Sequence, residues 1–150
     1  HMMEGIIIRL TPLADVKQIQ MHYTKEKDVL AVVDEMKLTL AISNLVDNAV
    51  KYTPEGGSVQ VTLDADHQNA FITVTDTGIG IPEEEVNRIF ERFYRVDKTR
   101  DRETGGTGLG LSITYATVMM HNGSIKVNSK ENEGTTVQVR IPLRQTHTTV

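Results

Sequence analysis

The chain has 150 residues, of which 39% are hydrophobic and 24% charged, and these values are typical of one globular domain with a real core. Its formal net charge of −4 argues against a nucleic-acid surface, which usually needs a basic patch. It contains no cysteine, which excludes disulfides and thiolate metal sites, and no apolar run near the roughly 18 residues that a membrane span requires.

The two ends of the chain suggest where its domain begins and ends. A His-Met pair precedes Met3 and resembles the remnant of an expression tag, so residues 1–3 are set apart. Residues 145–150 predict a frayed tail. No repeat or low-complexity segment interrupts the rest, so we expect a single domain over residues 4–144.

The first part of the chain predicts two strands followed by a helix. Residues 16–23 alternate between apolar and polar side chains, which indicates a half-buried strand, and the apolar run 29–33 predicts the next one. Asp34 can cap a helix that begins at Glu35 and ends before Pro54. The helix has an apolar stripe made of Leu38, Ile42, Leu45 and Ala49.

The second part predicts further elements in this order: a hairpin of strands 59–63 and 70–75, a helix over 83–93, a polar loop over 96–106, a helix over 108–121, and strands 124–128 and 135–141. Pro82 suits the first turn of one helix, and Asn122-Gly123 closes the other. Strands mixed with three helices indicate an α+β fold, a two-layer α/β sandwich with helices on one face of a single sheet. The pattern does not fix the strand order.

Three polar side chains project from one side of the first predicted helix. Asn44, Asn48 and Lys51 are spaced by four and three residues, so they flank the apolar stripe. A carboxamide oxygen is a hard ligand that suits Mg²⁺, which takes further oxygens from waters and phosphates. The same spacing also fits a polar helix edge that faces solvent.

An aspartate followed by two glycines comes after a predicted strand. Gly78 and Gly80 are expected to take positive φ and to let the backbone approach a flat ligand. Asp76 can accept a hydrogen bond from an exocyclic amine. An Asp-Thr-Gly turn without any ligand is also common at strand ends.

A glycine-rich segment leads into the last predicted helix. Gly106, Gly108 and Gly110 allow backbone amides to face a phosphate, and a helix N-terminus favours anions. The segment is not a P-loop, because no Gly-Lys-Ser/Thr follows, and Leu111 stands where a dinucleotide fingerprint needs its third glycine. A glycine-rich hinge is the alternative interpretation.

Four short segments stand in one order along the chain: 44–53, 76–80, 90–95 and 105–111. In this order and spacing they resemble the N, G1, F and G2 boxes of the ATP-binding domain of sensor histidine kinases, from about Val29 to Leu143. The resemblance implies the left-handed α/β sandwich shared by the histidine-kinase, gyrase, heat-shock-chaperone and mismatch-repair ATPases. This Bergerat-type ATP-binding fold has a mixed, mostly antiparallel sheet. The resemblance also implies ATP and Mg²⁺ as ligands and phosphoryl transfer to a histidine.

The resemblance assigns roles to the residues of these boxes. Asn48 is the implied metal ligand, with Asn44 supporting the same shell, and Lys51 and Tyr52 contact phosphate or ribose. Asp76 binds the adenine amino group, which favours ATP over GTP. Further nucleotide contacts are expected at Gly78, Gly80, Ile81, Tyr94, Arg95, Lys98, Gly106, Thr107, Gly108, Leu109, Gly110 and Leu111.

The charged segment between the F and G2 boxes resembles the lid that closes over nucleotide. Arg95 is the candidate for contact with the γ-phosphate, since phosphoryl transfer spreads negative charge over oxygens that a cation must stabilise. Lys98, Arg100 and Arg102 fit a solvated charge run equally well. No catalytic residue is assigned beyond the candidate Arg95.

An absent carboxylate indicates transfer of the phosphoryl group rather than its hydrolysis. Relatives that hydrolyse ATP carry a Glu four residues before the metal-binding Asn, where it can activate water. Here that position is Asn44, which cannot take up a proton usefully. We therefore expect a protein histidine kinase domain that keeps its γ-phosphoryl group for another acceptor.

The acceptor itself is not visible in this chain. In histidine kinases it lies on a dimerising helical hairpin and is usually followed by Glu or Asp, a context absent around the internal histidines His22, His67, His121 and His147. The resemblance thus implies a monomeric catalytic fragment from the cytoplasmic side of a membrane-anchored bacterial sensor. Its partners would be the phosphoacceptor domain and, indirectly, a response regulator.

Two other functions remain open on the same fold. One is a serine-kinase-type regulator of a sigma factor or of its antagonist, which the F box and the long charged lid fit less well. The other is a non-catalytic module in which ATP only sets the lid conformation for a partner.

Overall fold

The computed structural model describes residues 2–27, 29, 31, 33–80, 109–130 and 132–143. Within them, a five-stranded sheet has the order β1-β2-β3-β5-β4. Its strands are β1 (Gln20–Lys25), β2 (Ser58–Ala65), β3 (Asn69–Asp76), β4 (Ser124–Lys130) and β5 (Gly134–Pro142). β1 pairs with β2 in parallel, and the other three pairings are antiparallel. The expected mixed, mostly antiparallel sheet is therefore confirmed.

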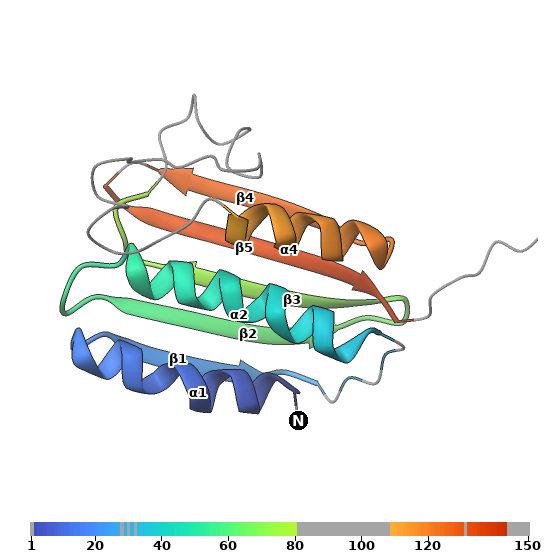
Figure 1. The fold of residues 1–150 in the computed structure, drawn as a ribbon, viewed down its shortest axis with the longest axis horizontal. Helices are drawn as coiled ribbons and strands as arrows, with labels where there is room; N and C mark the ends of the chain where they lie inside the picture. Colours follow the sequence, from blue (N-terminus) through green and yellow to red (C-terminus); the bar gives the residue numbers. More distant parts are fainter. Residues whose placement is uncertain are drawn as a thin grey trace, which may run out of the picture.

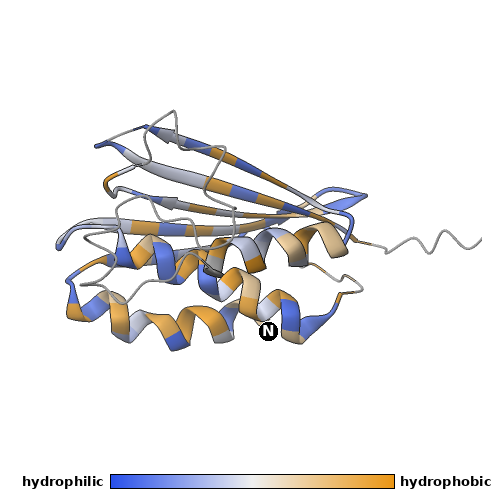
Figure 2. Ribbon diagram, turned by 45° about the horizontal axis from the view of Figure 1, so that its top comes forward, coloured by the Kyte–Doolittle hydropathy of each residue, from blue (hydrophilic) through white to orange (hydrophobic). Residues whose placement is uncertain are grey.

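The described helices are α1 (Met2–Val16), α2 (Glu35–Lys51) and α4 (Leu109–Met120). All three cover the same face of the sheet, so the domain has two layers (Figures 1 and 2). α2 lies between the other two and contacts both of them. The predicted α/β sandwich with helices on one face is confirmed.

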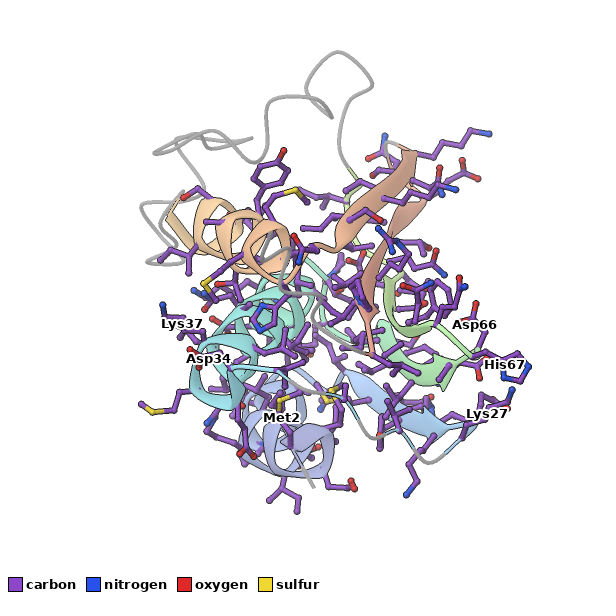
Figure 3. The ribbon with its side chains drawn as sticks, turned by 90° about the vertical axis from the view of Figure 1, so that its right-hand side faces the viewer. Met2, Lys27, Asp34, Lys37, Asp66 and His67 are labelled. Atoms are coloured by element: carbon purple, nitrogen blue, oxygen red, sulfur yellow. The ribbon has the colours of Figure 1, made fainter. Side chains whose placement is uncertain are left out.

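The helix α2 is fixed by its cap and by its apolar stripe. Asp34 is the N-cap of α2, and Asp34 Oδ1 accepts a hydrogen bond from the Lys37 amide over 3.1 Å. Both residues are labelled in Figure 3. All four predicted stripe residues are buried, and with the inward side chains of the sheet they form one core. The core members from the sheet are Val59, Val61, Ile72, Val74, Val139 and Ile141, and Ile19, directly before β1, joins them.

The structure corrects the predicted beginning of the sheet. The strand expected over 16–23 is wrong at its start, because Val16 still belongs to α1 and the strand begins at Gln20. The chain turns at Gln18, whose φ of 56° lies in the left-handed region. The expected alternation holds within β1, since Met21 is partly buried while its neighbours are exposed.

The strand expected over 29–33 is also wrong where it is described. Val29, Ala31 and Val33 lie outside any helix or strand, and only Val33 packs against the core. Residues 30 and 32 lie outside the described residues. A short apolar run alone does not specify a strand, because a linker without secondary structure can also bury one of its apolar side chains, as it does here with Val33.

The helix α1 was not anticipated from the sequence. It buries Met3, Ile6, Leu10 and Ala14, so this helix contributes to the core, and residues 2 and 3, which were set apart, belong to it. Pro12 lies inside this helix, although proline normally argues against a helix interior.

The remaining predicted elements that can be compared are confirmed. The hairpin forms β2 and β3, the last two strands form β4 and β5, and the last helix is α4. Asn122 takes a φ of 63°, and the Gly123 amide donates to the Val118 carbonyl over 2.9 Å, which closes that helix. The helix expected over 83–93, the loop over 96–106 and the tail 145–150 fall outside the described residues.

Candidate functional site

The candidate site lies where the end of α2, the start of α4 and the end of β3 meet (Figure 1). α4 runs antiparallel to α2, since the Thr114 hydroxyl donates to the Ala41 carbonyl over 3.0 Å and the Asp34 amide donates to His121 Nε2 over 2.9 Å. The N-terminal end of α4, which continues from the G2 box, is therefore next to the C-terminal half of α2, which carries the N box.

The C-terminal half of α2 presents the polar residues predicted from helical spacing. Asn44, Asn48 and Lys51 are half-buried on the edge of the helix. Lys51 Nζ lies 3.3 Å from Asp47 Oδ2, and both side chains are 30% exposed. This pair is partly open to solvent, so its contribution to stability is small. The Lys51 ammonium can exchange its carboxylate partner for a phosphate oxygen.

Asp76 ends β3 and is held by two backbone amides. Its Oδ1 accepts hydrogen bonds from the Gly78 amide over 2.8 Å and from the Thr135 amide over 3.3 Å. Burial raises the pKa of the Asp76 carboxyl above its usual 3.8, and these two hydrogen bonds oppose that rise. Among the described residues both amide bonds go to Oδ1, so Oδ2 is the oxygen that could accept from a ligand amine.

The loop after Asp76 is fastened to the end of α2. The Ile79 amide donates to the Tyr52 carbonyl over 3.2 Å. A Cβ at Gly78 would lie only 2.4 Å from that same oxygen, so no larger residue fits there. The expected positive φ is confirmed at Gly80, with 73°, but is wrong at Gly78. Gly78 is needed for close approach and not for its backbone angle.

The turn between β4 and β5 also supports this loop, and sequence reasoning missed it. The Asn132 amide donates to the Ile79 carbonyl over 2.6 Å, and Thr135 holds Asp76 as described above. Gly134 has a φ of 124°, and a Cβ there would lie 2.1 Å from the Asp76 carbonyl oxygen. A glycine after Asn-Glu signals a turn, but no local pattern could show what that turn touches.

Several predicted contacts cannot be placed. Leu111 is partly buried and packs against the core. Leu109 and Gly110 begin α4, and their side chains are not described. Ile81, Tyr94, Arg95, Lys98, Gly106, Thr107 and Gly108 lie outside the described residues. The structure thus joins the Asp76 loop to Tyr52 at the end of α2, and Asn44, Asn48 and Lys51 lie along that helix; the roles of these residues toward a ligand stay predictions.

The described histidines have the contexts of structural or solvent-exposed residues. His121 is buried, its Nδ1 lies 2.8 Å from the Thr117 carbonyl, and its Nε2 accepts from Asp34, which fixes the neutral form with the proton on Nδ1. His22 is exposed on β1, and His67 projects from the tip of the β2–β3 hairpin (Figure 3).

The described residues lack two features, a cluster of metal-binding side chains and a membrane-spanning helix. They contain no group of three His, Cys, Asp or Glu side chains that could hold a metal ion. None of the helices that the structure describes is long and apolar enough to cross a membrane.

Comparison with known proteins identifies the family. Residues 33–145 match the model of the histidine kinase-, DNA gyrase B- and HSP90-like ATPases, and the chain belongs to this family. The sensor histidine kinase WalK of Bacillus subtilis (strain 168) is 43% identical over 122 residues, which are 80% of this chain and 20% of the relative. The chain spans between 20% and 34% of the length of the first curated relatives it matches.

Solved structures agree with this assignment. The catalytic domain of histidine kinase ThkA superposes with a TM-score of 0.83 at 25% identity, covering 96% of this chain and 91% of that one. The mycobacterial sensor histidine kinase MprB gives 0.78 at 30% identity, covering 96% and 97%. The resemblance and the fold predicted from the four boxes are confirmed, and membership of this ATPase family implies that the chain binds ATP.

Proposed function

We propose that this chain binds Mg-ATP and supplies the γ-phosphoryl group to a histidine on a separate domain, as the catalytic domain of a two-component kinase. One observation carries the proposal: the loop that follows Asp76 is hydrogen-bonded to the Tyr52 carbonyl, so Asp76 and the end of α2 come from distant parts of the sequence and lie at the same end of the molecule. The distance along α2 from Asn44 to Tyr52 is about 12 Å at 1.5 Å per residue, enough to follow a triphosphate.

The α2 amides suit the proposed metal. Asn48 would hold Mg²⁺ through its side-chain oxygen, with Asn44 beside it, and the remaining positions would be filled by phosphate oxygens and water. The ion would neutralise charge on the phosphates and orient them. Lys51 adds a partly exposed cation at the same edge, and Asp76 would select the base.

The amide side chain at position 44, where hydrolysing relatives carry a Glu, supports transfer over hydrolysis. Asn44 stands one turn before Asn48 and is half-buried. Its amide can donate and accept hydrogen bonds but cannot remove a proton from water. The bound nucleotide is therefore preserved until an acceptor side chain reaches it.

A separate phosphoacceptor domain is the proposed partner. Among the described histidines, His121 is buried and bonded through both ring nitrogens, so it cannot attack a phosphate. Large apolar side chains exposed on the helices offer a contact surface: Ile8, Val16, Met36, Leu40, Ile113 and Met120. The fragment itself is proposed to be a monomer, with a response regulator as indirect partner and a membrane-anchored sensor as the parent protein.

Calorimetric titration tests ligand binding first. ATP is titrated with and without Mg²⁺, and GTP serves as the matched control. We expect metal-dependent, adenine-selective binding in the micromolar range, about −8 kcal/mol. No binding of any adenine nucleotide would refute the proposal.

The second experiment supplies the acceptor. A phosphoacceptor hairpin from a related kinase is added with γ-labelled ATP, and acid-labile phosphohistidine is measured, with a hairpin whose histidine is replaced by Gln as control. Binding of ATP without any phosphohistidine would favour the non-catalytic module. Acid-stable phosphoserine on an added anti-sigma-factor antagonist would favour the serine-kinase-type regulator.

A further inference from the structure

Lys17, the first residue after α1, bonds to the last turn of α2. Its Nζ donates to the Val50 carbonyl over 2.8 Å and to the Lys51 carbonyl over 3.0 Å. The last carbonyls of a helix have no partner within the helix, and a cation there also interacts favourably with the helix dipole. The Val50 carbonyl also accepts from the Thr53 amide over 3.3 Å, so the Lys17 side chain adds a second donor there, a donor to the Lys51 carbonyl, and a positive charge at the end of the helix that carries the N box.

The backbone around Lys17 is fixed on both sides. Its amide donates to the Ala14 carbonyl over 3.1 Å, and its carbonyl accepts from the Gly56 amide over 3.2 Å. The Gln20 amide then donates to the Gly57 carbonyl over 3.0 Å. The turn after α1 and the turn after α2 are thus joined, and the ammonium group is delivered from a rigid base.

The end of α2 is in turn the support of the base-binding loop. Tyr52 follows Lys51 directly, and its carbonyl accepts from Ile79, three residues beyond Asp76. A continuous set of hydrogen bonds therefore runs from α1 through the last turn of α2 to the Asp76 loop. Fraying of that turn would displace the Lys51 side chain and the Tyr52 carbonyl together.

We propose that Lys17 is a positioning residue for the nucleotide site, because it holds the last turn of α2 where both the phosphates and the Asp76 loop need it. This inference rests on the proposed function. Lys17 touches no ligand in this role; it acts through the carbonyls of Val50 and Lys51.

The test compares Lys17→Met with Lys17→Arg. Methionine keeps the apolar stem but loses both hydrogen bonds and the charge, so ATP binding should weaken about five- to tenfold. Arginine can still donate to both carbonyls, so the ATP affinity of the Lys17→Arg variant should stay within about twofold of wild type. Amide hydrogen exchange at Tyr52 and Ile79, measured without nucleotide, should accelerate in the methionine variant alone.

Arg140→Met is the matched control for general loss of stability. Arg140 Nε donates to the Ser124 hydroxyl over 3.0 Å and Nη1 to Asn69 Oδ1 over 2.9 Å. Arg140 stands five residues along β5 from Thr135, about 16 Å from the Asp76 end. This variant should melt earlier than wild type but bind ATP with unchanged affinity.

The outcomes separate the inference from the proposed function. Wild-type affinity in Lys17→Met, or an equal loss of affinity in Arg140→Met, would overturn the positioning role. If the wild-type domain binds no Mg-ATP, the proposed function fails by itself. In that case faster exchange at Tyr52 and Ile79 would still support the mechanical role of Lys17, and unchanged exchange would overturn it.

Discussion

Replacing Gly78 by Ala tests the contact between the Asp76 loop and the end of α2. The added methyl carbon would lie 2.4 Å from the Tyr52 carbonyl oxygen and 2.9 Å from Asp76 Oδ1. Ordinary contact begins at 3.4 Å, so the loop must retreat by about 1 Å from a backbone atom that cannot rotate away. The retreat breaks the bond from Ile79 to Tyr52 and moves the carboxylate of Asp76.

The expected magnitude follows from these two effects. Overpacking costs about 1–3 kcal/mol and one lost hydrogen bond about 1 kcal/mol, so the domain should lose about 2–4 kcal/mol. For a chain of this size each kcal/mol lowers the melting temperature by about 2–4 °C, which predicts a fall of about 5–15 °C. Affinity for ATP should drop more than about tenfold, because a 1 Å shift removes a hydrogen bond to the base.

Circular dichroism melting and calorimetric titration measure the two quantities. Gly5→Ala is the matched control: Gly5 lies inside α1 with nothing within 4 Å of its added Cβ, so alanine should stabilise the domain by about 0.5–1 kcal/mol and leave ATP affinity unchanged. A Gly78→Ala domain that melts within about 2 °C of wild type and binds ATP normally would refute the described packing.

Three further substitutions test the site and its frame. Asp76→Asn should abolish the preference for ATP over GTP. It should also raise the melting temperature at pH 7, because burial disfavours the charged Asp76 carboxylate, as its raised pKa shows, and the amide carries no charge. In wild type the raised pKa of the folded state makes stability fall as pH rises from 3.8, the pKa of the unfolded state, through the folded pKa. Melting temperatures measured at several pH values should show a smaller fall in the variant. Asn48→Asp adds a negative charge beside the triphosphate, so titration should show weaker Mg-ATP binding; undiminished affinity would remove Asn48 from the metal shell. His121→Leu leaves the Asp34 amide without the imidazole acceptor and removes the side-chain contact to the Thr117 carbonyl, which keeps its bond from the backbone amide of residue 121; it should cost about 1–3 kcal/mol in urea unfolding, with nucleotide affinity unchanged in the folded protein.

Local patterns in the sequence were sufficient for much of the fold. α2 was found because its cap, stripe and terminating Pro54 agree, and the β2–β3 hairpin was found because alternation flanks a polar turn. α1 was missed since Pro12 falls inside it and the run from Ile6 to Ile8 hides the helical period. The error at Val16 followed from the same omission.

The candidate site likewise contains some residues that the sequence predicts and some contacts that it does not. Asn44, Asn48 and Lys51 share a helix edge, which spacing alone reveals. The support of Asp76 by Thr135 joins residues 59 positions apart, and only strand pairing between β3 and β5 brings them together. Such non-local contacts carry no sequence period, so spacing cannot reveal them.

The packing of α1 shows that the folded core extends beyond the part of the chain matched by the family model. The family match begins at residue 33, yet Met3, Ile6, Leu10 and Ile19 lie in the same core as α2. Each such side chain contributes about 2 kcal/mol by leaving water, and together they match a large part of the net stability of a typical domain. A domain excised at residue 33 would thus lack α1, β1 and part of its core, so a chimeric sensor built from this module should include these two elements as well as the segment that matches the family model.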